Sequence, residues 1–432
     1  DADGNPASYE YGKQASAEFL ATLLERDSGN PTDPSTLTDT IVYGAQNGLG
    51  LIDLRGKSYD DLIWDDLLDQ LTAEDYQTLI SSSGYGTPEL KSVGKPYCMD
   101  ADSATGLVFG SAGGTTFNGA EVTAQTWNRE LALAFGNLLG NDALLGSGTV
   151  GWYCPATNIH RTPFSGRNNE YYSEDAFMSG SMASATVQEA AKKGLYTFVK
   201  HFALNDQENH RGDGGDGGVA TWSGEQAIRE IYLKPFEMCM KIDPVEMNYL
   251  EKQEDGSYQN ATTTVPACNA LMTSFNRLGV TWTGGHYNLI TNVLRGEWGF
   301  NGFIITDANS HLGRMDARQM IEAGGSGSLR YLKDTQFIFD KDSISDYHYG
   351  REAAHSILYT IANSKAMNGA MPGSTLTGMA TDKKFRILLT IVPALLLVFF
   401  VYRIFRVWKP SKRKLAKLEA KAAKKAAKQK QA

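Results

Sequence analysis

In this 432-residue sequence, five polar residues follow short apolar runs. These residues are Asp102, Arg161, Lys200, His201 and Asp307. The runs have the length and composition of buried strands. The carboxyl ends of parallel strands meet at one face of a barrel, where enzymes of that architecture hold their active sites. We therefore expect the two carboxylates, the two cations and the imidazole to converge on one site.

Asp307 follows the apolar run Ile304-Ile305-Thr306. A carboxylate at the end of a buried strand is costly unless it is paired, so it is either held by a cation or functional. A carboxylate flanked by cations stays ionised at neutral pH, as a nucleophile that attacks the anomeric carbon of a sugar must. An ion pair that only ties two strand ends together is the structural alternative.

The other residues leave both a binding and a structural role open. Asp102 is placed to accept hydrogen bonds from two neighbouring sugar hydroxyls, or it simply begins a loop. His201 beside Lys200 contacts a substrate, or it is a satisfied core histidine. For the pair Arg167 and Glu170, we expect a scaffold role rather than catalysis.

Motifs for other chemistries are absent from the sequence. It has no phosphate-binding glycine loop, no GxSxG turn and no HExxH helix. Its cysteines (Cys98, Cys154, Cys239 and Cys268) form no CxxC pair and no metal-ligand pattern, which favours buried thiols over a disulfide.

Apolar strand-like runs alternate with amphipathic helical patterns from Tyr59 onward. The expected strands are 96–99, 149–154, 195–202, 271–275 and 302–305. The expected helices are 59–70, 121–139, 178–192, 225–240, 286–295 and 349–363. This order predicts the α/β class with a parallel sheet, closed into a regular or irregular (β/α)8-type barrel.

Five segments are expected along the chain. Residues 1–58 form a lead-in with one helical stretch, 59–365 the barrel, 366–385 a linker, 386–408 a transmembrane helix and 409–432 a basic tail. Because the sequence opens on Asp1 without an apolar leader, we expect a processed or truncated chain.

The net charge of −8 is the sum of an acidic body and a basic C-terminal tail. From Arg403 to the end there are twelve Lys or Arg and one acid, Glu419, whereas residues 1–402 hold 29 Lys or Arg and 48 Asp or Glu. The body therefore carries −19 and the tail +11. An acidic body argues against a nucleic-acid partner, which needs a positive face.

Residues 387–402 contain no charge and extend about 24 Å as a helix. Flanking apolar residues, with Arg403 and Arg406 reaching the headgroups, bring the helix to spanning length. The positive-inside rule places the tail in the cytoplasm and residues 1–385 outside the cell. We expect a single-pass protein of the cell membrane; a buried core helix is the alternative.

Four ordered blocks resemble those of family-three glycoside hydrolases. Residues 158–175 resemble the block NIHRxPxxGRxxEYYSED, and residues 200–208 resemble KHFAxNxxE. Residues 272–277 resemble MxSYNR, and residues 294–307 resemble LRxEWGFxGxxxSD, in which the aspartate is the nucleophile. The resemblance covers about residues 60–365.

This resemblance implies a retaining exo-glycosidase on a (β/α) barrel, most often a β-glucosidase, acting on an oligosaccharide or glycoside. It implies that Asp307 is the nucleophile and that Phe275 stands where the family usually has a tyrosine. It also implies hydrogen bonds to the terminal sugar from Asp102, Arg161, Lys200 and His201. No cofactor is implied.

The sequence also departs from the family pattern. Ala308 replaces the aromatic residue that generally follows the nucleophile, and residues 102–106 read DSATG in place of DGPAG. In the β-glucosidase-like branch a separate α/β sandwich domain donates the general acid/base. We expect that domain upstream, as in circularly rearranged members, or on a partner chain. The alternative is a catalytically silent, membrane-tethered carbohydrate-binding protein.

Overall fold

The computed structural model describes residues 15–109, 114–209, 218–309, 314–330, 337–368, 381–409 and 411–430. The chain divides into two compact units, Asp1–Met379 and Ala380–Ala432. The boundary falls within the predicted linker, of which residues 369–380 lie outside the described part of the chain.

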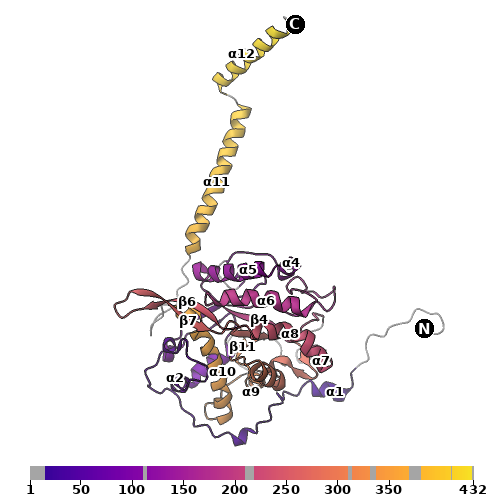
Figure 1. Cartoon of the computed structure of the whole chain (residues 1–432), viewed down its shortest axis with the longest axis vertical. Helices are drawn as coiled ribbons and strands as arrows, with labels where there is room; N and C mark the ends of the chain where they lie inside the picture. Colours follow the sequence, from indigo (N-terminus) through magenta and orange to yellow (C-terminus); the bar gives the residue numbers. More distant parts are fainter. Residues whose placement is uncertain are drawn as a thin grey trace, which may run out of the picture. The chain divides into compact units, whose positions relative to one another are not determined.

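A curled seven-stranded sheet forms the centre of the first unit (Figure 1). In spatial order its strands are β1 (Gly86–Thr87), β2 (Cys98–Ala101), β3 (Thr149–Trp152), β4 (Tyr196–Phe202), β8 (Ala270–Thr273), β11 (Phe303–Ala308) and β12 (Gly327–Leu329). From β2 to β12 every neighbouring pair is parallel. The amides of Ser83 and Gly84 donate to the carbonyls of Ser328 and Arg330, which links the two ends of the sheet.

All five predicted strands are present, within a few residues of their expected bounds. The predicted barrel is irregular, because its central sheet has seven strands among the described residues and β1 runs antiparallel to β2. Only residues 88–97 join β1 to β2. A parallel pair needs a longer crossover connection, so the segment turns back on itself.

The first unit contains ten α-helices among its described residues, several of them packed on the central sheet. Their bounds are α1 (Ala17–Thr22), α2 (Ile63–Leu68), α3 (Ala73–Ser81), α4 (Ala120–Gln125), α5 (Arg129–Asp142), α6 (Ala176–Ala191), α7 (Glu225–Ala227), α8 (Lys234–Met240), α9 (Ala317–Glu322) and α10 (Ile344–Ala362). Two further helical segments are Ile228–Tyr232 and Asn288–Glu297. Helices α6 and α8 pack on β4, and α10 packs on β11 (Figure 1).

Side chains that point alternately to the two sides of the strands form a hydrophobic core on both faces of the sheet. Phe198 and Phe303 belong to one buried cluster, and their neighbours Val199 and Ile304 belong to a second one that includes α6 and α8 side chains. Successive strand residues point to opposite faces. The near-continuous apolar runs of β4 and β11 therefore reflect burial on both sides.

Two predicted helices are interrupted. The expected helix 121–139 is two helices, because Trp127 has a positive φ of 54° and Asn128 then caps α5 by accepting from the amides of Glu130 and Leu131. The expected helix 225–240 changes from α7 through the segment Ile228–Tyr232 to α8. Pro235 lies at the start of α8, where its missing amide costs no hydrogen bond.

Two smaller sheets complete the first unit. Strands β5 (Ala220–Thr221), β9 (Arg277–Leu278) and β10 (Thr281–Trp282) form one. Strands β6 (Val245–Lys252) and β7 (Tyr258–Val265) form an antiparallel hairpin. Most hairpin residues are exposed or half-buried, so the segment lacks the apolar run that marks a buried strand.

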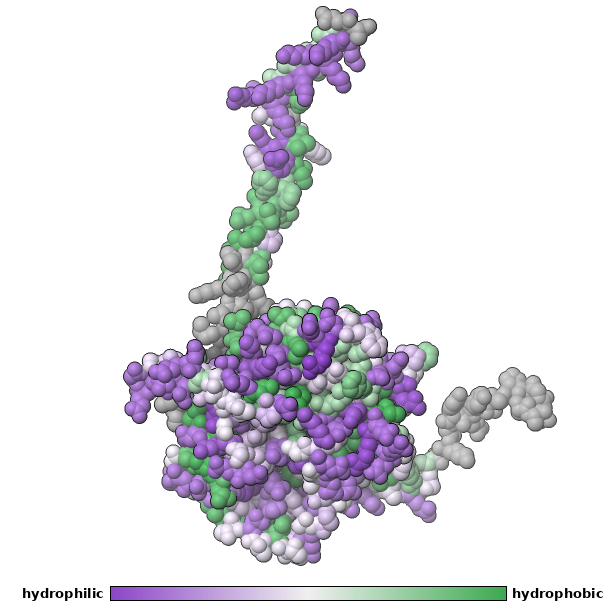
Figure 2. All heavy atoms as spheres, in the orientation of Figure 1, coloured by the Kyte–Doolittle hydropathy of each residue, from purple (hydrophilic) through white to green (hydrophobic). Residues whose placement is uncertain are grey.

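The second unit consists of α11 (Thr381–Trp408) and α12 (Lys412–Gln429). Within α11, the stretch Leu389–Trp408 is long and apolar enough to cross a membrane. Figure 2 shows hydrophobic residues along α11 and hydrophilic residues along α12. The predicted helix is therefore present, with the length and composition that a membrane span requires.

Candidate active site

Charged side chains gather at the carboxyl ends of the parallel strands. Asp102 directly follows β2, Lys200 and His201 lie near the end of β4, and Asp307 lies near the end of β11. The loop after β3 adds Arg167 and Glu170. The sheet thus brings four of the five polar residues singled out from the sequence to one face, as the strand order predicts.

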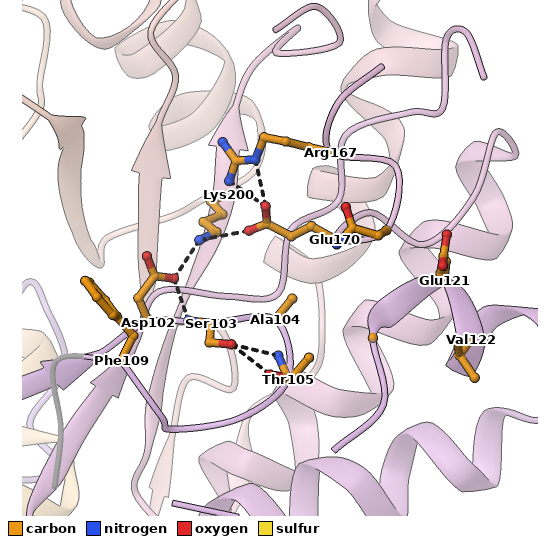
Figure 3. A pocket seen from close by; sticks show the side chains of 12 residues that line it. Asp102, Ser103, Ala104, Thr105, Phe109, Glu121, Val122, Arg167, Glu170 and Lys200 are labelled. Carbon is orange, nitrogen blue, oxygen red and sulfur yellow. Dashed lines mark hydrogen bonds and ion pairs between the residues drawn. The ribbon is translucent and has the colours of Figure 1, made fainter. Parts of the chain in front are cut away.

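Lys200 links two of the carboxylates in this cluster (Figure 3). Its Nζ lies 2.8 Å from Oδ1 of Asp102 and 3.1 Å from Oε1 of Glu170. Burial would lower the pKa of the Lys200 ammonium, but Cys154, Glu170 and Asp102 raise it well above its ordinary value. Lys200 is therefore a permanent cation that holds both carboxylates in place.

Glu170 stays ionised although it is mostly buried. Its Oε2 accepts from Nε of Arg167 at 2.7 Å and lies 2.6 Å from Nη2. Burial would raise the pKa of Glu170, whereas Lys200 and Arg167 lower it below its ordinary value. The expected Arg167–Glu170 pair is confirmed, and the structure adds that this pair belongs to the charged cluster itself.

His201 is held from several sides. Nη2 of Arg167 lies 3.0 Å from Nε2 of His201, and Oδ2 of Asp307 lies 3.7 Å from that nitrogen. A guanidinium has donors only, so Nε2 accepts and the ring proton is on Nδ1. Nδ1 lies 3.5 Å from the hydroxyl of Tyr171. The ring is therefore neutral in this arrangement.

The backbone of His201 is clamped by a side chain that the sequence did not single out. Oδ1 of Asn158 accepts from the His201 amide at 2.8 Å, and Nδ2 of Asn158 donates to the His201 carbonyl at 3.0 Å. Both residues are buried. This clamp fixes the loop after β3 against the end of β4.

Asp307 is almost buried, with 11% of its side chain exposed. Its Oδ1 accepts from the amide of Ala308 at 2.7 Å, which fixes the carboxylate orientation. Burial would lower the pKa of the Arg167 guanidinium, whereas Tyr171, Glu170 and Asp307 together raise it above its ordinary value. The carboxylate is thus oriented and set beside a cation.

A cavity of about 530 Å³ opens beside this cluster. Asp102, Arg167, Glu170 and Lys200 line one part of it, and Figure 3 shows Phe109, Val122 and residues 103–105 on the rest. The volume is in the range of small-molecule pockets. The lining thus combines charged and neutral polar side chains with Phe109 and Val122, whereas Asp307 and His201 are not among its residues.

Two residues singled out from the sequence lie elsewhere. Arg161 is exposed and lines a different cavity. The chain leaves the sheet after Asn158 and returns only at Arg167, which supplies the guanidinium of the cluster. Phe275 is half-buried against the main core and lines neither of these two cavities.

The sequence profile described as "Glycosyl hydrolase family 3 N terminal domain" matches residues 73–326. The chain belongs to glycosyl hydrolase family 3. It is 31% identical over 253 residues to β-glucosidase A of Butyrivibrio fibrisolvens, and the alignment covers 56% of this chain and 27% of that protein. It is 30% identical over 304 residues to β-glucosidase B of Emericella nidulans. That alignment covers 68% of this chain and 32% of the relative.

Solved β-glucosidase structures share the fold. A β-glucosidase from Paenibacillus barengoltzii superimposes with a TM-score of 0.61 at 26% identity, covering 78% of this chain and 36% of that one. β-Glucosidase 3B from Thermotoga neapolitana in complex with glucose superimposes with a TM-score of 0.55 at 26% identity. That superposition covers 70% of this chain and 43% of the other. The chain spans about a quarter to a third of the length of these curated relatives.

Proposed function

We propose that this family 3 chain is the barrel part of a retaining exo-glycosidase that hydrolyses terminal β-linked sugars. The observation that carries the proposal is Asp307, a buried and oriented carboxylate at the mouth of the sheet, beside His201. The relatives named β-glucosidases support the β-glucoside class of substrate.

The proposed reaction proceeds by double displacement. A carboxylate oxygen of Asp307 attacks the anomeric carbon, the bond to the glycosidic oxygen breaks, and the leaving group takes a proton from a general acid. The conjugate base then deprotonates a water molecule, which attacks the anomeric carbon and releases Asp307. No metal or organic cofactor takes part.

The charged cluster binds the terminal sugar in this proposal. Oδ1 of Asp102 is engaged by Lys200, and about a quarter of the Asp102 side chain is exposed toward the cavity. Its carboxylate can therefore accept from neighbouring sugar hydroxyls, while Lys200 and Arg167 donate. We assign Arg167, rather than Arg161, as the guanidinium of this site.

The general acid/base comes from outside this chain. The relatives are three to four times longer than the stretch they share with it, which leaves room in them for further domains. We propose that an α/β sandwich domain, upstream or on a partner chain, supplies the group. Rapid hydrolysis of an unactivated disaccharide by this chain alone would contradict that assignment.

The C-terminal unit anchors the enzyme to the cell membrane. The apolar stretch of α11 precedes α12, which is rich in lysine. The positive-inside rule then places α12 in the cytoplasm and the barrel outside the cell.

An activated substrate tests the reaction without the acid/base. Dinitrophenolate needs no proton to leave, so dinitrophenyl β-glucoside should release it in the presence of the chain. The variant Asp307→Ala should abolish the release. A chain that binds glucose without releasing dinitrophenolate would instead be a silent carbohydrate-binding protein.

A further inference from the structure

Most of the cations of α12 lie on one face of that helix, which we call the cationic face. At about 100° per residue, they fall within an arc of about 120° that no other residue of the helix interrupts. The residues of this face are Arg413, Lys414, Lys417, Lys421, Lys424, Lys425 and Lys428. We propose that the cationic face binds the anionic lipid headgroups of the cytoplasmic leaflet.

The cationic face is open to solvent in the described part of the chain. Every residue from 412 to 430 is exposed, and Figure 2 shows hydrophilic side chains along α12. Glu419, the only acid of α12, lies on the opposite side of the helix. The helix therefore does not neutralise this face with its own carboxylate.

The cations of this face repel one another. Lys417 lies four residues before Lys421, which lies four residues before Lys425, and Lys424 and Lys428 have the same spacing. Like charges at this spacing destabilise an isolated helix. An exposed helix of this length has no tertiary packing to offset the repulsion. A surface of negative charge would therefore stabilise α12 by its contact with all of these cations.

The position of α12 in the chain favours a lipid surface as this partner. Residues 409–411 alone separate α12 from α11, whose stretch Leu389–Trp408 is apolar enough to cross a membrane. The cytoplasmic leaflet is negatively charged and attracts lysines that lie close to a membrane span. This inference rests on the proposed membrane anchor and adds the class of lipid that the tail contacts.

The side of α12 opposite the cationic face is only weakly apolar. It consists mainly of alanines, and Leu415 and Leu418 are the only large apolar residues of the helix. Insertion of this side between the lipids would bury little apolar area. The contact is therefore electrostatic, and added salt should weaken it.

Hydrogen exchange of the full chain in lipid nanodiscs tests the proposal. One set of discs contains phosphatidylcholine alone, and the other contains phosphatidylcholine and phosphatidylglycerol in equal parts. Headgroup contact stabilises the helix, so we expect phosphatidylglycerol to slow the exchange of the amides of residues 412–429 about tenfold. High salt should remove this difference.

Two double variants with the same net charge separate the cationic face from the total charge. Lys417→Gln with Lys421→Gln removes two charges from the face and should abolish most of the lipid effect. Lys412→Gln with Lys430→Gln removes two charges from the opposite side and should retain it. An equal loss in both variants would overturn the cationic face as the binding surface.

Other outcomes separate this inference from the anchor. Equal exchange in the two kinds of disc would overturn headgroup binding, although the chain is inserted. Protection by duplex DNA in phosphatidylcholine discs, with none from phosphatidylglycerol, would assign the face to a nucleic acid and also overturn it. A full chain that does not enter the discs would refute the anchor, and this inference with it.

Discussion

Nη2 of Arg167 lies 3.0 Å from Nε2 of His201, and the same guanidinium pairs with the carboxylate of Glu170. Since the guanidinium only donates, it fixes the histidine as a neutral ring with its proton on Nδ1. One residue of the loop after β3 therefore sets both the charge and the orientation of a residue on β4, next to Asp307.

We expect the replacement of Arg167 to reduce the activity strongly, although Arg167 lies on a loop. Arg167→Ala removes a donor to the substrate and leaves Glu170 with one cation, so we expect a loss of dinitrophenyl glucosidase activity of about a hundredfold or more. Arg167→Lys should recover little, because an ammonium cannot bridge Glu170 and His201 together. Steady-state kinetics measure this loss, with the surface variant Arg229→Ala as control.

Removing Lys200 should destabilise the fold as well as the site. Lys200→Met leaves Asp102 and Glu170 without their buried cation, and we expect the free energy of unfolding to fall by about 3–5 kcal/mol. Adding Asp102→Asn should restore part of that loss, because Asp102 pairs with Lys200, whereas Glu170 keeps its pair with Arg167. Denaturant titration of both variants checks this; a double variant less stable than Lys200→Met would contradict it.

His355 makes stability depend on pH. Burial lowers its pKa from 6.5 to about 3, and its ring stacks on Tyr59 with the centroids 3.9 Å apart. The unfolded chain therefore binds a proton that the folded chain rejects, so stability falls as the pH drops from about 6.5 toward 3. His355→Phe keeps the stacking, and its melting temperature should fall less steeply over that range.

Truncation should separate the barrel from the membrane. A chain that ends at residue 380 lacks α11 and α12, so we expect it to leave the membrane fraction, whereas the full chain should resist extraction with alkaline carbonate. The activity toward dinitrophenyl β-glucoside should be the same in both forms. A full chain that carbonate releases would contradict the anchor.

Burial explains which strands could be predicted. β4 and β11 are covered on both faces, so their sequences are continuous apolar runs with recognisable ends. The hairpin of β6 and β7 is mostly exposed, and β12 has only three residues, so neither carries such a signal. The break between α4 and α5 falls at Trp127, with neither glycine nor proline to mark it.

The sequence predicts those site residues that lie at the ends of strands. Asp102, Lys200, His201 and Asp307 follow from the strand ends, because the sheet order alone places them together. Arg161 and Arg167 lie in one loop, where spacing does not say which arginine returns to the sheet. The contact of Arg167 with His201, 34 residues away, decides this, and such a long-range contact has no local signature.

The central claim is that Asp307 is the nucleophile of a retaining glycosidase. Incubation with 2,4-dinitrophenyl 2-deoxy-2-fluoro-β-glucoside, followed by proteolysis and mass spectrometry, tests it most directly. We predict one fluoroglucosyl adduct, on the peptide that contains Asp307, and none in Asp307→Ala. An adduct on another residue, or no adduct while dinitrophenolate is still released, would contradict the assignment.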